Sequence, residues 1–168
     1  MKTLVVGLGN PILTDDGVGV KVAYAVRDAL ASAGLPGVTV TEASVGGLHL
    51  MEMMAGYDRV ILVDAIQTQA GQSGAVYSLT LGDVAAATPT QHSASAHDMN
   101  LPTALEMGRR LGLALPDTVE IFAIEVEDVV TFGESCTRAV NAAIPVATEL
   151  VLRSLAEGPP TSHQEEGI

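Results

Sequence analysis

Cysteine and positive charge are both scarce in this sequence, and each shortage excludes a class of protein. The chain of 168 residues has one cysteine, Cys136, which rules out an internal disulfide framework and a zinc site built from several cysteines. Its 8 Lys and Arg residues face 20 Asp and Glu residues, for a formal net charge of −12. Because such a surface repels nucleic acids and anionic membranes, the charge favours a cationic partner, either a metal ion or a basic peptide.

Long apolar runs and the commonest functional motifs are missing as well. No apolar run reaches about 18 residues, so no transmembrane helix is expected. The opening "MKTLVVGLGN" breaks into glycines too early for a signal peptide, and we expect a cytoplasmic protein. The sequence has no P-loop lysine, no G-x-S-x-G and no H-E-x-x-H, which removes the usual signatures of P-loop nucleotide binding, serine hydrolysis and zinc proteolysis.

What the sequence does contain is an alternation of strand and helix patterns typical of one α/β domain. Hydrophobic residues make up 48% of the chain, enough for a substantial core. The order of the patterns predicts a single, mostly parallel sheet between layers of helices over residues 1–157, and a disordered tail over 158–168. The predicted strands are 3–9, 37–43, 58–66, 75–81 and 117–128, and the predicted helices are 16–34, 46–56, 101–111 and 140–155. We expect Asp15 or Asp16 to cap the first helix, Pro145 to start or kink the last, and residues 88–100 to be polar and flexible.

Three polar residues are predicted to meet at one edge of this sheet. Asp16 follows the first strand, Asp64 lies near the end of the most apolar strand in "ILVDAI", and His97 precedes the helix that starts at Leu101. Because ligands of α/β sheets lie beyond the carboxyl ends of the strands, these side chains predict an open metal site. Carboxylate and imidazole ligands suit Ni, Zn, Fe or Mn.

Each of these residues also has a simpler interpretation. Asp16 can be a helix cap, Asp64 can accept hydrogen bonds from loop amides, and His97 can be an ordinary polar loop residue. Cys136 could be considered as a nucleophile, but no histidine stands beside it in the sequence, and a buried structural thiol is the simpler explanation. A dinucleotide-binding loop is also a poor match, because Ile12 occupies the place of its third glycine.

In their order and spacing, "GLGNPILTDDGVGV", "ILVDAI" and "AHDMNLPTAL" resemble motifs of the nickel–iron hydrogenase maturation endopeptidases. The resemblance extends over nearly the whole ordered length. It implies a twisted, phosphorylase/hydrolase-like sheet of about five strands sandwiched between helices. It also implies that Asp16, Asp64 and His97 bind nickel, and it leaves open whether the same residues carry the chemistry. The first loop is then a carboxylate platform for a divalent cation, to which Asp15 adds a further negative charge.

The implied activity is removal of a C-terminal extension from a hydrogenase large-subunit precursor after nickel has been inserted. Nickel would be recognised in the precursor and held weakly or not at all by the free enzyme. The sequence departs from the family pattern in two places. After the second strand, many relatives have Asp-Gly-Gly, but this chain has Glu42 and a shifted Gly46-Gly47. After the strand at Ile121, many relatives have a proline, which this chain lacks. We interpret both as subgroup features that bear on which hydrogenase is processed.

Two other functions remain as alternatives. A non-catalytic nickel escort would share the three ligands but leave the length of the precursor unchanged. A peptidyl-tRNA hydrolase also begins with "GLGNP", but it would need a basic surface and a catalytic His-Asn pair near the first loop. This chain has Asp15 and Asp16 in that region.

Overall fold

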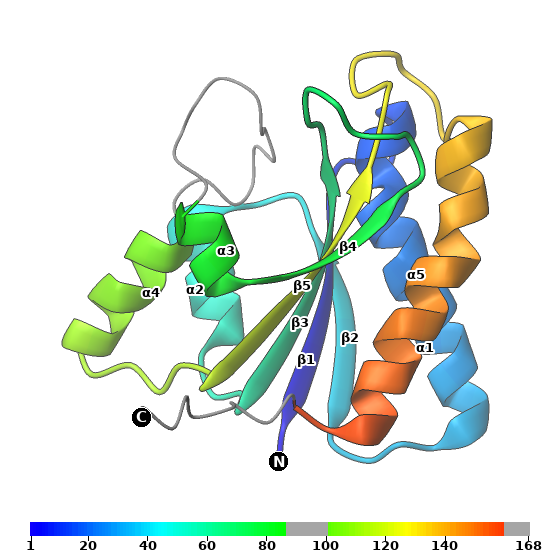
Figure 1. Cartoon of the computed structure of the whole chain (residues 1–168). Coiled ribbons are helices and arrows are strands. Elements are labelled where there is room, and N and C mark those ends of the chain that lie inside the picture. Colours follow the sequence, from blue (N-terminus) through cyan, green and yellow to red (C-terminus); the bar gives the residue numbers. More distant parts are fainter. Residues whose placement is uncertain (87–100, 160–168) are drawn as a thin grey trace, which may run out of the picture.

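The computed structural model describes residues 1–86 and 101–159, which form an α/β domain (Figure 1). Within these residues a five-stranded sheet has the order β2-β1-β3-β5-β4, in which β4 is antiparallel to its neighbour and the other strands are parallel. The elements are β1 (Thr3–Leu8), the 3-10 helix η1 (Thr14–Gly17), α1 (Val18–Ala33), β2 (Val38–Ala43), α2 (Gly47–Met54), β3 (Arg59–Ile66), β4 (Val76–Thr80), α3 (Leu81–Ala86), α4 (Leu101–Arg110), β5 (Thr118–Glu125) and α5 (Arg138–Glu157). The predicted α/β fold with a mostly parallel sheet is confirmed.

Strand β3 lies in the middle of the sheet, as its continuous apolar sequence predicts. A central parallel strand is covered on both faces and therefore needs apolar side chains on both. Val60 to Val63 are all fully buried. The parallel register pairs Val63 with Gly7 of β1 and with Phe122 of β5, so the carboxyl ends of these three strands meet at one edge of the sheet.

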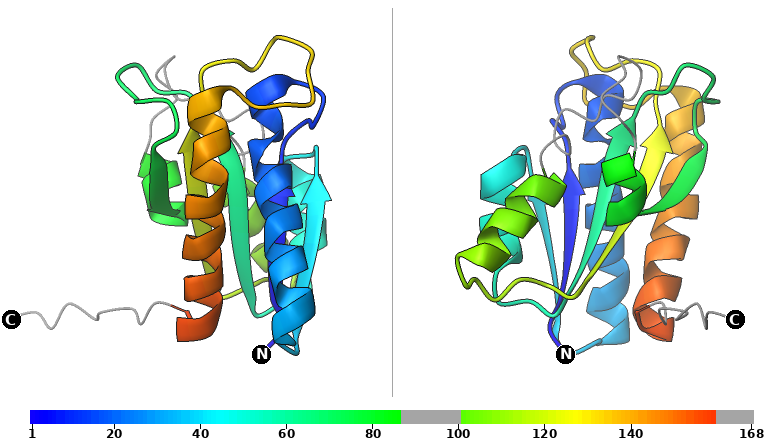
Figure 2. Two further views of the ribbon diagram at one scale, coloured as in Figure 1. Left: turned by 90° about the vertical axis from the view of Figure 1, so that its right-hand side faces the viewer. Right: turned by 60° about the vertical axis from the view of Figure 1, so that its left-hand side comes forward.

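The helices form two layers, one on each face of the sheet (Figure 2). Helices α1 and α5 cover the face that receives Ile61 and Val63. Helices α2 and α4 cover the other face, which receives Val60 and Leu62. Successive residues of a strand point to opposite faces, so Asp64 belongs to the α2–α4 side.

Three details differ from the sequence-based expectation. Neither Asp15 nor Asp16 caps α1: both lie in η1, and the N-cap position of α1 is Gly17, without a side-chain cap. Helix α5 begins at Arg138, so Pro145 lies inside the helix and does not start it. The short helix α3 has no counterpart in the predicted pattern.

Helix α5 is also long and apolar enough, by length and composition alone, to cross a membrane. In the fold, however, one of its faces lies in the core, where Val140, Ala143, Ala147 and Val151 are buried against the sheet and α1. Packing within the domain accounts for this face of α5, while 22% of its most apolar stretch is buried in all.

The amino edge of the sheet holds a buried ion pair. The guanidinium of Arg59 is 1% exposed and lies 2.6 Å from Oε1 of Glu120. Ser154 of α5 closes the cluster: its hydroxyl accepts a bond from Arg59 and donates one to Glu120, both at 2.6 Å. This cluster joins β3, β5 and α5 at the edge opposite to the candidate site.

Candidate active site

The glycine-rich loop after β1 brings the backbone of η1 and α1 directly onto the ends of two strands. An ideal Cβ on Gly19 would lie 2.3 Å from the carbonyl oxygen of Val63 and 2.4 Å from that of Leu8. Gly9 has a φ of +131°, and a Cβ there would lie 1.8 Å from the carbonyl oxygen of Asp16. Only glycine permits both the conformation and the approach. The glycines of this loop thus serve close backbone packing at the sheet edge.

Asp16 lies in the last turn of η1, with its side chain half-buried at the carboxyl edge. Its Oδ2 accepts a hydrogen bond from the backbone N–H of Asn10 at 2.8 Å. This bond crosses the loop and fixes the direction of the carboxylate. Asp16 is therefore a positioned carboxylate in the loop and not a helix cap.

Asp64 is the second predicted ligand, and it lies near the end of β3, two residues before Ile66. Its side chain is 1% exposed, and its Oδ1 accepts the N–H of Ala65 at 2.8 Å. The preceding residue, Val63, is the one whose carbonyl lies against Gly19. The start of α1, and with it the turn that carries Asp16, therefore packs beside the strand end that carries Asp64.

His97, the third predicted ligand, lies in residues 87–100, outside the described residues, so its place at the site stays a prediction. The chain continues from this segment into α4 at Leu101. Leu101 is fully buried in the same apolar cluster as Leu8 and Leu62, on the sheet face to which Asp64 belongs. In residues 1–86 and 101–159, no group of three His, Cys, Asp or Glu side chains could hold a metal ion.

The carboxylate oxygens of Asp16 and Asp64 are of a type that binds hard or borderline divalent cations. Together with an imidazole ligand, they would suit a metal such as nickel. Two predicted ligands are too few to form a complete metal site by themselves. Such a site needs His97, groups of a partner, or both.

Asp15 has a different function from the one expected of it. Its carboxylate is fully buried and accepts four hydrogen bonds: from the backbone N–H groups of Glu127 (3.3 Å), Asp128 (3.0 Å) and Thr137 (2.7 Å), and from the Thr137 hydroxyl (3.0 Å). Its charge is directed at these donors. Asp15 therefore ties η1 to the connection between β5 and α5 and does not add an open carboxylate for a cation.

Glu125, at the end of β5, is a buried carboxylate that sequence reasoning missed. It is 2% exposed and accepts bonds from the N–H and the hydroxyl of Thr68 at 2.7 and 2.9 Å. Gly71 packs so closely that a Cβ there would lie 2.0 Å from the Glu125 carboxyl carbon. Burial, followed by the charge of Glu125, raises the pKa of the nearby Tyr77 hydroxyl. Glu125 thus anchors the connection that follows β3 by hydrogen bonds to Thr68. The only sequence signal for this role of Glu125 was its position as an acidic residue at a strand end.

Cys136 is half-buried, and its Sγ lies 3.6 Å from the carbonyl oxygen of Thr14. Burial raises the pKa of the thiol, Lys21 opposes that effect, and Asp15 adds to it. A thiol with a raised pKa is a weak nucleophile at neutral pH. The structure therefore favours a structural thiol, although one less buried than expected.

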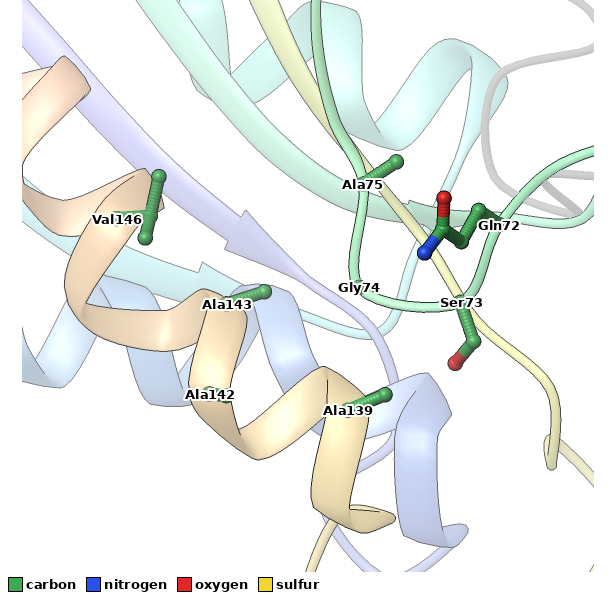
Figure 3. Close-up of a pocket in the computed structure, with 8 residues that line it drawn as sticks. All are labelled: Gln72, Ser73, Gly74, Ala75, Ala139, Ala142, Ala143 and Val146. Atoms are coloured by element: carbon green, nitrogen blue, oxygen red, sulfur yellow. The ribbon is translucent and has the colours of Figure 1, made fainter.

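A shallow depression of about 320 Å³ lies between the connection after β3 and helix α5 (Figure 3). It is formed by residues 72–75 and by the small side chains Ala139, Ala142, Ala143 and Val146 of α5. Figure 3 shows the Ser73 hydroxyl directed toward the start of α5. No titratable side chain lines the depression, so it offers no group for acid–base or metal chemistry.

Comparison with known proteins identifies the relatives of this chain. The hydrogenase maturation protease family matches residues 5–154. The hydrogenase 2 maturation protease of Escherichia coli (strain K12) is 29% identical over 158 residues, which cover 94% of this chain and 92% of that protein. The hydrogenase expression/formation protein HupD of Rhizobium leguminosarum bv. viciae is 25% identical, with 92% of this chain and 74% of that protein covered.

Solved structures agree with these matches. The hydrogenase maturating endopeptidase HybD from E. coli superposes with a TM-score of 0.73 at 26% identity, and the alignment covers 94% of this chain and 93% of HybD. The [NiFe] hydrogenase maturation protease HybD from Thermococcus kodakarensis has a TM-score of 0.64 at 21% identity, with 91% and 98% covered. At that identity the second match supports the fold alone.

Proposed function

The chain belongs to the hydrogenase maturation protease family, and we propose that it is the endopeptidase that removes the C-terminal extension of a nickel–iron hydrogenase large-subunit precursor after nickel insertion. The observation that carries this proposal is the arrangement of Asp16 and Asp64. Backbone packing at Gly19 brings the turn that holds one of them against the strand end that holds the other. The family match covers both residues.

In this proposal the two carboxylates, together with His97, recognise nickel as part of the precursor. Asp16 is held by the N–H of Asn10, and Asp64 is fixed at the end of the central strand. Such preorganised side chains can complete the coordination of a nickel ion that the precursor presents. Cleavage would then depend on correct nickel loading, because a precursor without nickel offers these residues nothing to bind.

Within the same proposal, the scissile peptide lies beside the carboxylates when nickel is engaged. A carboxylate next to a metal-bound substrate can orient water or accept its proton. The raised pKa of the Cys136 thiol argues against a cysteine nucleophile. We also propose that processing takes place in the cytoplasm, in line with the expectation from the sequence.

The test compares nickel-loaded and nickel-free precursor, incubated with the purified protein and weighed by mass spectrometry. We expect loss of the C-terminal extension only from the nickel-loaded form. Asp16→Asn and Asp64→Asn should abolish the cleavage. Asp28→Asn, which removes an exposed carboxylate from the middle of α1, is the matched control and should cleave normally. Nickel binding without any change in precursor mass would instead identify an escort.

A further inference from the structure

Large apolar side chains stand exposed beside the candidate active site. Val130 and Phe132, in the connection between β5 and α5, are each 79% exposed, and Ile12, in the loop after β1, is 49% exposed. Single exposed apolar residues are common on protein surfaces. These three are adjacent, because the N–H of Gly133 donates to the carbonyl of Ile12 at 2.9 Å and the two loops form a short parallel bridge. We call these three residues the apolar tip.

The backbone of the apolar tip is held by hydrogen bonds on both sides. Oδ1 of Asp128 accepts the N–H groups of Val130 and Thr131 at 3.2 and 2.9 Å. The Thr14 hydroxyl donates to the carbonyl of Thr131 at 2.6 Å, and the Thr14 N–H donates to that of Gly133 at 2.9 Å. A tip fixed in advance loses little conformational entropy when a partner covers it.

Backbone strain at Thr14 also indicates that the apolar tip is held in a fixed conformation. Thr14 is the one non-glycine residue with a positive φ, +44°, among residues 1–86 and 101–159. This conformation is unfavourable for a β-branched side chain, and it persists only where the surroundings enforce it. Here the enforcing contacts are the bonds to the connection that carries the tip.

The tip and Asp16 are parts of one unit. Ile12 precedes η1, which contains Asp16, and the buried Asp15 ties η1 to the connection that carries Phe132. Figure 2 shows this connection beside the N-terminal end of α1, at the carboxyl edge of the sheet. A protein that offers a group to Asp16 therefore meets the apolar tip as well.

Charge around the tip limits the chemistry of the partner. Glu127 and Glu134 flank it and are exposed, and the chain as a whole carries a net charge of −12. A partner that covers the tip needs an apolar depression to receive Phe132 and Val130. It also needs Lys or Arg side chains at the border of that depression, since unpaired or like charges at an interface are unfavourable.

We infer that the apolar tip is the docking surface for the folded large-subunit precursor, which receives it in an apolar depression bordered by basic side chains. This inference rests on the proposed function. It adds that recognition of the precursor has two parts: the tip binds the folded body, and the carboxylates engage the metal and the adjoining peptide.

The test is a double substitution, Val130→Ser with Phe132→Ser, assayed on nickel-loaded precursor. Burying a Phe and a Val contributes enough to binding that their loss should raise KM roughly 10- to 100-fold, with kcat little changed. Affinity for the precursor, measured by surface plasmon resonance, should fall by the same factor and weaken further with added salt. Both side chains are exposed, so the melting temperature should not change.

Leu111→Ser is the matched control, because Leu111 is 73% exposed and directly follows α4. Figure 1 shows α4 on the other side of the sheet from α5 and the connection that leads into it. It should leave KM unchanged. An unchanged KM in the double variant, or an equal rise in the control, would overturn the docking inference while leaving the proposed function intact. If the wild-type protein does not cleave the precursor at all, the proposed function fails instead. Sedimentation analysis adds a separate check: a wild-type dimer that the double variant dissociates would assign the tip to self-association and overturn the inference.

Discussion

Replacing Asp15 by Asn should destabilise the protein, whereas the same change at Asp16 should not. Asn has nearly the shape of Asp, but one carboxylate oxygen becomes an NH₂ group. At position 15 both oxygens accept bonds from N–H or O–H donors: Oδ1 from the N–H of Thr137, and Oδ2 from Glu127, Asp128 and the Thr137 hydroxyl. An NH₂ group in the place of either oxygen would point a hydrogen-bond donor at another donor, and the hydrogen bond at that place would be lost.

The magnitude follows from the number of bonds lost. In its better orientation, the Asn oxygen takes the place of Oδ2, and only the bond to the Thr137 N–H is lost outright. A hydrogen bond to a charged group contributes about 1.5–3 kcal/mol. We therefore expect the free energy of unfolding to fall by about 2–3 kcal/mol. For a domain of this size that corresponds to roughly 4–12 °C in melting temperature.

Asp16 provides the contrast. Its side chain is half-buried, and an Asn amide oxygen can still accept the one bond from the Asn10 N–H. We expect the stability of Asp16→Asn to stay within about 0.5 kcal/mol of the wild type, with processing abolished. Urea denaturation measures the free energy of unfolding of the two variants, and a precursor cleavage assay measures their processing activity. Equal stability of wild type and Asp15→Asn, or marked destabilisation by Asp16→Asn, would refute this division between the adjacent aspartates.

Four further outcomes are expected. His97→Ala should abolish processing and keep the wild-type melting temperature; full activity would remove His97 from the site. Calorimetric titration of the free enzyme with nickel should show weak binding, because two aspartates and one imidazole leave coordination positions open, and nanomolar affinity would contradict precursor-dependent recognition. Arg59→Met leaves the half-buried carboxylate of Glu120 without its guanidinium partner. It should lower the free energy of unfolding by about 3 kcal/mol, the lower end of the range for a buried pair, and leave kcat unchanged at temperatures where the variant is folded; a smaller loss in urea titrations would show that the pair is dispensable. The N–H groups of Thr131 and Val130 hold the pKa of Asp128 below its ordinary value of 3.8, so its stabilisation is present above that pH and lost as the pH falls through the lower folded value. The difference in melting temperature between wild type and Asp128→Asn should therefore shrink below pH 3.8, and a constant difference would contradict this.

Elements with a strong local pattern were predictable from the sequence. The apolar run of β3 identified the central strand and placed Asp64 near its end. The spacing of Val18, Val22 and Val26 identified α1, and Gly34 identified its end, where it adopts the left-handed conformation. Such patterns can be recognised within a short stretch of sequence, because the burial of one or both faces of an element dictates the spacing of its apolar residues.

Features that depend on the direction of a side chain were not predictable. The sequence presents Asp15 and Asp16 as equivalent neighbours, but η1 buries the first completely and leaves the second half-buried, with its carboxylate on the N–H of Asn10. The ion pair of Arg59 joins residues more than sixty positions apart in the chain, and no local pattern reports such a partner. Glu125 looked like one more acid at a polar strand exit, and its burial follows from the close approach of Gly71.

The two adjacent aspartates explain how one short turn can serve both recognition and structure. A cation site needs a carboxylate whose charge is still available, but a tight loop at a sheet edge needs an acceptor for its backbone N–H groups. Asp15 satisfies the second need by accepting bonds from the connection that carries the apolar tip. The first need, a carboxylate for the cation, is the proposed role of Asp16. Because the same turn fixes both the tip and Asp16, the proposed docking implies that a precursor in the wrong orientation cannot bring its metal to the carboxylates. The geometry of docking is then itself a condition for cleavage.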